Sequence, residues 1–274
     1  MHLLYAYGLG GSLRAQPEIE AVFLPVGFRV VRIPVPYHDN PLALFGRLAT
    51  LTFADLCQWI HEGAERLIRT AQLFAPEEYA VVGDSLGGFI SVVAAQRDSR
   101  ISHCVLLGCS GDICDAATRL HRLNRALALF VGRLAPGDSE DLKTAARRAA
   151  SGESSSQREF ELVDTLNPDR LSRLRNLLIL GDKRDPVAPE AICQRFAQSV
   201  RNATVRMVYD EGRHHPIGKD ALERYALPFL RDQPVPPVLM VPSKRRMLAG
   251  IERLLIALQK ALRRRSRGPN RPAL

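Results

Sequence analysis

The chain has 274 residues, of which 46% are hydrophobic, so it is long enough for one large domain with a complete core. Its formal net charge is +9, but ten basic residues and a single acidic residue follow position 233, which leaves 28 of each kind in residues 1–233. Because the body of the chain is neutral, its charge gives no reason to expect a nucleic-acid partner.

The cysteines and the first residues of the chain indicate a compartment. Five cysteines are an odd number without metal-ligand spacing, which is typical of buried thiols in a reducing environment. The N-terminal residues lack the basic and apolar regions and the cleavage site of a secretory signal, and no run of about eighteen apolar residues occurs. We therefore expect a cytoplasmic protein that nothing anchors across a membrane.

Strand-like apolar segments alternate with helical patterns along most of the chain. These segments cover residues 2–7, 28–33, 79–82, 101–107, 176–180 and 204–209. Strands that alternate with helices in this way pair in parallel, with helices on both faces of the sheet. The sequence therefore predicts an α/β fold with a doubly wound, mostly parallel sheet.

The rhythm breaks between residues 112 and 161, which contain no strand-like segment and show helical spacing over 119–133 and 140–150. We interpret 112–161 as a helical cap inserted above the sheet, between core segments 1–111 and 162–233. Four prolines then mark residues 234–242 as an extended linker that ends the domain.

The tail, residues 243–274, carries almost all of the net charge. Residues 244–267 can form an amphipathic helix, because apolar residues recur at spacings of three and four while basic residues gather on the opposite side. Its apolar stripe consists of Leu248, Ile251, Leu255, Leu258 and Leu262. Such a helix can contact an anionic membrane surface, or pack on the body or on a second copy of the chain. Residues 243–267 are thus the expected site of peripheral membrane contact or homo-oligomerisation.

The first chemical motif is Gly83-Asp84-Ser85-Leu86-Gly87, which has the spacing G-x-S-x-G between a strand and a helical pattern. A turn this sharp strains the backbone of the serine and leaves no space for side chains at positions 83 and 87. The motif predicts Ser85 as a nucleophile, whereas a tight turn with a capping serine is the plainer interpretation.

A serine needs a histidine to accept its proton, and that histidine needs a carboxylate to orient it. The strand over 176–180 ends in a loop with Asp182 and Asp185, of which Asp185 is favoured because Pro186 ends the loop and Asp182 follows a glycine, where side chains cap turns. The last strand runs into His214 and His215, and the pattern alone does not choose between them. The chain order of serine, acid and base is Ser…Asp…His.

Acyl transfer also needs N–H donors for the developing oxyanion, typically from the residue after the nucleophile and from a loop after an earlier strand. These positions are Leu86 and Leu9, the latter within Tyr7-Gly8-Leu9-Gly10-Gly11-Ser12. A dinucleotide-binding loop is the rival, but G-x-G-x-x-G fails because position 13 is leucine. The chemistry requires neither a cofactor nor a metal.

Four motifs together resemble the α/β-hydrolase superfamily over nearly all of residues 1–232: YGLGGS, VVGDSLGGF, LGDKRDPV and EGRHHP. The resemblance implies the triad Ser85, Asp185 and His214, since similar proteins carry the acid just before Pro-Val and the base two positions after a glycine. It also implies a shortened sheet of about six strands. Two departures are Tyr7-Gly8, where a His-Gly pair is common, and Asp84, where histidine is frequent.

The resemblance implies an enzyme that cleaves a carboxylic ester, similar to esterases and thioesterases. A thioesterase or acyltransferase that acts on carrier-bound acyl groups uses the same triad, so the alternative stays open. Substrate identity and chain length are not encoded in any of the four motifs.

Overall fold

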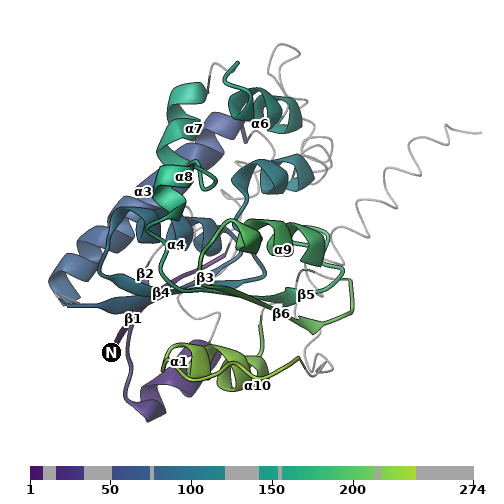
Figure 1. Ribbon diagram of the computed structural model, residues 1–274. Helices are drawn as coiled ribbons and strands as arrows, with labels where there is room; N and C mark the ends of the chain where they lie inside the picture. The colour runs from purple at the N-terminus through teal and green to yellow at the C-terminus, as the bar shows by residue number, and fades with distance from the viewer. Residues whose placement is uncertain are drawn as a thin grey trace, which may run out of the picture.

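The computed structural model describes residues 1–8, 17–33, 51–74, 77–120, 142–153, 156–212, 214 and 217–238, and these contain a six-stranded sheet (Figure 1). Its strands are β1 (His2–Ala6), β2 (Arg29–Ile33), β3 (Tyr79–Asp84), β4 (Ile101–Leu107), β5 (Leu177–Asp182) and β6 (Ala203–Tyr209). Their order is β2-β1-β3-β4-β5-β6, and every neighbouring pair is parallel. The predicted doubly wound α/β sheet is confirmed, with all six strands within two residues of their expected bounds.

Helices cover both faces of the sheet. On one face lie α3 (Phe53–Phe74), α4 (Leu86–Arg97) and α9 (Glu190–Gln198), and on the other lie α1 (Pro17–Phe23) and α10 (Lys219–Ala221) (Figure 1). The short segments η1 (Leu24–Val26), η2 (Leu222–Ala226) and α11 (Leu227–Phe229) continue α1 and α10. Because both faces are covered, all residues of β4 and β5 are buried, which explains why most of them are apolar.

The helix that follows the serine is the most deeply buried one. All residues of α4 except Arg97 are buried, so this helix is apolar around its whole circumference. Helix α3 lies beside it and approaches closely at Gly63, where an added Cβ would lie 2.5 Å from Ile90 Cδ1. Helix α4 is therefore packed closely between the sheet and α3.

The segment between β4 and β5 is helical where it is described. A helix over 113–120 is followed by α6 (Leu142–Ala150), α7 (Gln157–Val163) and α8 (Pro168–Leu171). Helix α7 packs on α3, with the rings of Phe160 and Phe53 5.9 Å apart. No strand interrupts the described part of this segment, but residues 121–141 lie outside the described residues, so a cap over 112–161 stays a prediction.

The described C-terminal segment is fastened to the body. Arg206, on edge strand β6, donates hydrogen bonds to the carbonyl oxygens of Val235 and Pro236 at 3.3 and 3.0 Å. His103 Nε2, on β4, lies 3.0 Å from Asp232 Oδ1. The first part of the proline-rich segment thus lies along the sheet edge, whereas the predicted tail helix falls outside the described residues.

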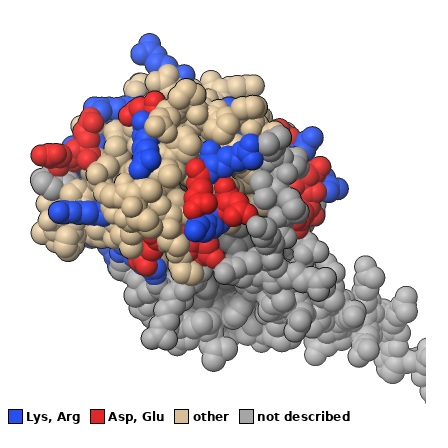
Figure 2. All heavy atoms as spheres, turned by 90° about the horizontal axis from the view of Figure 1, so that it is seen from below, with Lys and Arg blue, Asp and Glu red and all other residues tan. Residues whose placement is uncertain are grey.

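Charges of both signs are mixed on the face that carries α1 and α10 (Figure 2). One ion pair links this helix layer to the sheet, since Arg32 Nε on β2 lies 2.8 Å from Glu20 Oε1 on α1. The mixture agrees with the neutral balance of residues 1–233. Among the helices that the structure describes, none is long and apolar enough to cross a bilayer.

Candidate active site

The strand order reverses direction between β1 and β3, because β2 lies on one side of β1 and all later strands lie on the other. In open parallel sheets, ligands bind at the carboxyl ends of the strands at such a reversal. Gly8 follows β1, and Ser85 follows β3. A Cβ added at Gly8 would lie 2.9 Å from Ser85 Cβ, so the two segments meet at this crevice.

Ser85 occupies the sharp turn between β3 and α4. Its backbone angles are φ 51° and ψ −113°, and only one other described non-glycine residue, Asp232, has a positive φ. The turn is held by two hydrogen bonds: the Ser85 N–H donates to the Leu107 carbonyl at 2.9 Å, and the Gly88 N–H donates to the Ser85 carbonyl at 2.9 Å. Such a conformation costs on the order of 1–3 kcal/mol and is typical of functional sites.

The glycines around Ser85 permit close backbone contacts. A Cβ at Gly83 would lie 2.2 Å from the Gly87 carbonyl oxygen, and one at Gly87 would lie 2.1 Å from the Ala6 carbonyl oxygen. Real Cβ atoms do not approach backbone oxygens so closely, because the overlap is far inside van der Waals contact. The expected lack of space for side chains at positions 83 and 87 is therefore confirmed.

Three of the predicted site residues come together at the strand ends. His214 Nε2 lies 3.0 Å from Ser85 Oγ, and His214 Nδ1 lies 2.8 Å from Asp185 Oδ2. Asp185 is buried, and its other oxygen, Oδ1, accepts hydrogen bonds from the N–H groups of Val187 and Ala188 at 2.7 and 3.1 Å. This leaves Oδ2 aimed at the imidazole, which fixes a tautomer with the proton on Nδ1 and a lone pair on Nε2.

The surroundings of His214 favour its protonated form. Burial by itself lowers the pKa of His214, but the hydrogen bond and negative charge of Asp185, together with the charge of Asp84, raise it above its ordinary value of 6.5. The histidine can thus accept a proton readily, and the resulting imidazolium is stabilised by a carboxylate in contact with it.

Leu86, the first of the two predicted oxyanion donors, is the first residue of α4. The N–H groups in the first turn of a helix have no partner within the helix and point toward a site beyond its N-terminus. Leu9, the second predicted donor, lies outside the described residues, although Gly8 beside it contacts the turn at Ser85.

The alternatives left open by the sequence fall in different places. Asp182 is not in the hydrogen-bonded group with Ser85; it accepts backbone N–H groups from Arg184, Glu211 and Gly212. It therefore caps its turn, as expected from its position after a glycine, and also contacts the loop that carries His214. His215 lies outside the described residues.

Two further residues near the site were not assigned a function from the sequence. Asp84, before the serine, places Oδ2 3.1 Å from where a Gly8 Cβ would lie, so its carboxylate is beside the loop after β1. Arg119 donates to the Pro186 carbonyl at 3.3 Å and thus links the helix over 113–120 to the loop after β5. Sequence spacing could not reveal the second contact, because its two residues are 67 positions apart.

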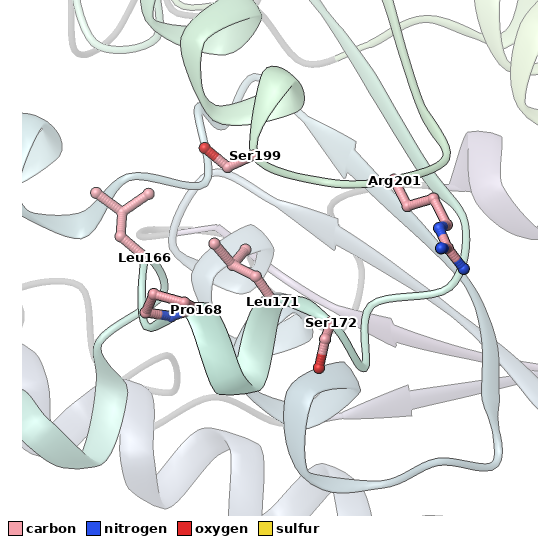
Figure 3. A pocket seen from close by; sticks show the side chains of 6 residues that line it. All are labelled: Leu166, Pro168, Leu171, Ser172, Ser199 and Arg201. Carbon is pink, nitrogen blue, oxygen red and sulfur yellow. The ribbon is translucent and has the colours of Figure 1, made fainter.

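A cavity of about 570 Å³ lies between α8 and the loop after α9 (Figure 3). The residues that line it come shortly before β5 or β6 along the chain. The cavity is therefore at the amino ends of the strands, opposite Ser85. The residues that line it are Leu166, Pro168, Leu171, Ser172, Ser199 and Arg201. No group of three His, Cys, Asp or Glu side chains in the described part of the chain is arranged to hold a metal ion.

No protein-family model and no curated protein matches this sequence. Solved structures do: a puromycin hydrolase aligns with a TM-score of 0.56 and 17% identity over 88% of this chain and 35% of that chain. Est1E from Butyrivibrio proteoclasticus aligns with a TM-score of 0.51 and 13% identity over 84% of this chain and 88% of that chain. A metagenomic alpha/beta hydrolase from lagoon sediments of Mar Chica, Morocco, aligns with a TM-score of 0.49 and 18% identity over 84% of this chain and 87% of that chain.

The first two alignments cover 88% and 84% of this chain, and its six-stranded parallel sheet with helices on both faces is the sheet of an α/β hydrolase. The chain has the α/β-hydrolase fold. We call the turn at Ser85 the elbow and, after the roles expected of Asp185 and His214, we call residues 183–189 the acid loop and residues 210–216 the base loop. At these identities, the likeness establishes the fold alone.

Proposed function

We propose that the chain is a serine hydrolase that cleaves a carboxylic ester through an acyl-enzyme on Ser85. The observation that carries the proposal is the continuous pair of contacts from Ser85 Oγ to His214 Nε2 at 3.0 Å and from His214 Nδ1 to Asp185 Oδ2 at 2.8 Å. A serine, a histidine and a carboxylate at hydrogen-bonding distance are the arrangement that activates a hydroxyl for acyl transfer.

In the first half of the reaction, Ser85 Oγ attacks the ester carbonyl carbon while His214 Nε2 accepts the hydroxyl proton. The negative charge that develops on the carbonyl oxygen is stabilised by the Leu86 N–H and, in this proposal, by the Leu9 N–H. The carbon–oxygen bond to the leaving group then breaks, and His214 returns the proton to the departing alkoxide. The product alcohol leaves, and the acyl group stays on Ser85.

In the second half, a water molecule takes the place of the alcohol. His214 accepts a proton from the water as its oxygen attacks the acyl carbon, and the proton passes to Ser85 Oγ as the acid is released. Asp185 holds the imidazolium in place through Oδ2, while Oδ1 accepts hydrogen bonds from two backbone N–H groups.

Thioester hydrolysis and acyl transfer to an alcohol or amine use the same three residues and differ only in the leaving group or the acceptor. The ester is proposed because its hydrolysis by water requires no binding site for an acyl carrier or for a second acceptor in addition to Ser85, His214, Asp185 and the donors at the elbow. The puromycin hydrolase and Est1E share this fold, but at 17% and 13% identity they do not indicate the substrate class of this chain.

The test is covalent labelling by a fluorophosphonate, followed by intact-mass measurement. We expect the wild-type protein to gain one adduct on Ser85, and Ser85→Ala to gain none while it keeps its circular dichroism spectrum. Ser110→Ala is the matched control, because Ser110 is another buried serine that follows a strand, and it should label at the wild-type rate. Labelling of Ser85→Ala would exclude Ser85 as the nucleophile.

Acyl-enzyme masses after incubation with matched esters and thioesters of the same acyl chain then identify the substrate class. Faster turnover of the esters supports the proposal. Faster turnover of the thioesters, or transfer of the acyl group to an added alcohol in preference to water, would instead assign the alternative class.

We also propose that residues 243–267 are a docking element outside the catalytic body. Truncation after Val238 retains the carbonyls of Val235 and Pro236 that Arg206 binds, so the edge of the sheet stays covered. The truncated protein should hydrolyse a small soluble ester at the full-length rate and should lose either binding to anionic vesicles or oligomer mass. A truncated protein that is inactive on the small ester would show that the tail completes the site.

A further inference from the structure

Asp182, the last residue of β5, is a charged residue buried away from the reacting groups. Its side chain is 1% exposed. Oδ1 accepts hydrogen bonds from the Arg184 N–H at 2.9 Å and the Gly212 N–H at 3.1 Å, and Oδ2 accepts one from the Glu211 N–H at 2.8 Å. A buried carboxylate that accepts several N–H groups is held in a fixed position, because each lost bond removes part of the stabilisation of a desolvated charge.

These bonds join two loops that are distant in sequence. The Arg184 N–H belongs to the acid loop, two residues after Asp182, whereas the Glu211 and Gly212 N–H groups belong to the base loop, 29 and 30 residues further along. A residue that only capped its own turn would need the first bond alone. The two bonds to the base loop hold the backbone just before His214 against the end of β5.

The backbone of the same residue also fixes the acid. The Asp185 N–H donates to the Asp182 carbonyl at 3.1 Å, which closes the turn that presents the Asp185 side chain. The pairing of β5 with β6 continues past the strand ends, since the Lys183 N–H donates to the Tyr209 carbonyl at 2.8 Å. Asp182 is thus bonded to the turn of Asp185 through its carbonyl and to the loop of His214 through its carboxylate.

We propose that Asp182 is a positioning residue that holds Asp185 and His214 in register with each other, an inference that rests on the function proposed above. The charges that raise the pKa of His214 are those of Asp185 and Asp84. Asp182 therefore acts through geometry, and its loss should slow the reaction without moving the pH at which His214 becomes protonated.

A second link between the two loops provides a matched control. Arg184 Nε lies 2.5 Å from Asp210 Oδ1, but the side chains of this pair are 65% and 41% exposed. Exposed ion pairs contribute little, because solvent screens them. Asp182→Asn and Asp210→Asn are the same chemical change at a buried and at an exposed contact between the same two loops.

The experiment compares wild-type protein, Asp182→Asn, Asp210→Asn and Ser85→Ala. In Asp182→Asn, the side-chain NH₂ group faces a backbone N–H group. Because two donors cannot form a hydrogen bond, we expect the base loop to shift. Because a displacement of about 1 Å can cost on the order of 100-fold in rate, the fluorophosphonate labelling rate and kcat should fall roughly 10- to 100-fold. KM and the acid-side midpoint of the pH profile should stay unchanged, and the low-field proton signal of His214 Nδ1–H should weaken. Asp210→Asn should stay within about two-fold of wild type.

A fluorophosphonate labelling rate of Asp182→Asn within two-fold of the wild-type rate would overturn the inference. A slower rate together with a shifted midpoint of the pH profile would also overturn it, because that result would indicate an electrostatic role. If Asp182→Asn does not fold, amide exchange in the wild-type protein decides, because the Glu211 and Gly212 amides should be protected, and rapid exchange would exclude the link. Failure of the proposed function gives a different result. If wild-type protein is not labelled, or if Ser85→Ala is labelled, Ser85 is excluded as the nucleophile. Amide exchange then still tests whether Asp182 links the two loops.

Discussion

The elbow and the pair of acid and base loops position their residues by different physical means. The elbow is continuous in sequence, and close packing fixes it: Gly83 and Gly87 leave no space for a Cβ between β3, α4 and β1. Asp185 and His214 arrive on separate strands, and hydrogen bonds across about 30 residues hold them together. Close packing thus fixes the position of Ser85, and a network of hydrogen bonds fixes the positions of Asp185 and His214.

The largest effect should come from adding one carbon to the elbow. In Gly87→Ala, the new Cβ would lie 2.1 Å from the Ala6 carbonyl oxygen, so β1 or α4 must move. Overpacking against a rigid backbone costs about 3 kcal/mol or more, which corresponds to a fall in Tm of roughly 10 °C for a domain of this size. Calorimetry should show this loss together with loss of fluorophosphonate labelling.

Gly181→Ala is the control for that substitution. Gly181 lies near the end of β5, but its Cβ would meet only the Met207 side chain, at 3.4 Å from Sδ and 3.6 Å from Cε, which is ordinary contact. We expect its Tm within about 3 °C of wild type, since surroundings that accept a methyl group change stability little. An equal fall in Tm in Gly87→Ala and Gly181→Ala would show that the elbow is not packed more closely than the end of β5.

The next effect tests the polar network at the acid. In Asp185→Asn, an amide faces His214 Nδ1 and favours the tautomer with the proton on Nε2, which cannot accept the Ser85 proton. Loss of the correct tautomer costs on the order of 10⁴-fold in kcat, while KM should change little. Steady-state kinetics with a small ester measure it. If Asp182→Asn proved more damaging than Asp185→Asn, the assignment of the acid would be wrong.

The contrast between the two regions also explains what the sequence could predict. The elbow is local, so its spacing, its two glycines and the flanking strand and helix were sufficient to place Ser85 at a strained turn. All six strands were predicted because each is a mostly apolar segment that alternates with helical patterns. The link from Asp182 to Glu211 and Gly212 was not predicted, because a carboxylate that binds backbone N–H groups places no requirement on the side chains of its partners.

A smaller effect should follow from strain placed in the base loop. Gly212 has φ 70° and Gly152 has φ 79°, and a Cβ at either position meets nothing closer than 3.7 Å. Alanine at each position should therefore cost the same 1–2 kcal/mol, roughly the penalty of a left-handed residue. Only Gly212→Ala should also lower kcat, by roughly 10-fold, because relaxation of that strain displaces the loop of His214. Equal kcat in the two variants would show that the base loop tolerates displacement.

The smallest effect concerns Asp84, which belongs to the elbow by position and to the polar network by charge. His214 must be neutral to accept the Ser85 proton, so activity falls as the pH drops through its pKa. The charge of Asp84 is one of the causes that raise the pKa of His214, along with the hydrogen bond and charge of Asp185 and against the effect of burial. Asp84→Asn keeps the shape of the side chain and removes the charge, so the pKa of His214 should fall and the acid limb of kcat/KM should move to lower pH. The plateau at high pH should stay unchanged, and the variant should be faster than wild type in acid.

Asp169→Asn is the control, because it removes the same charge on α8, at the amino ends of the strands, and should leave the pH profile unchanged. If the pH profiles of Asp84→Asn and Asp169→Asn coincide, the charge of Asp84 does not affect the pKa of His214.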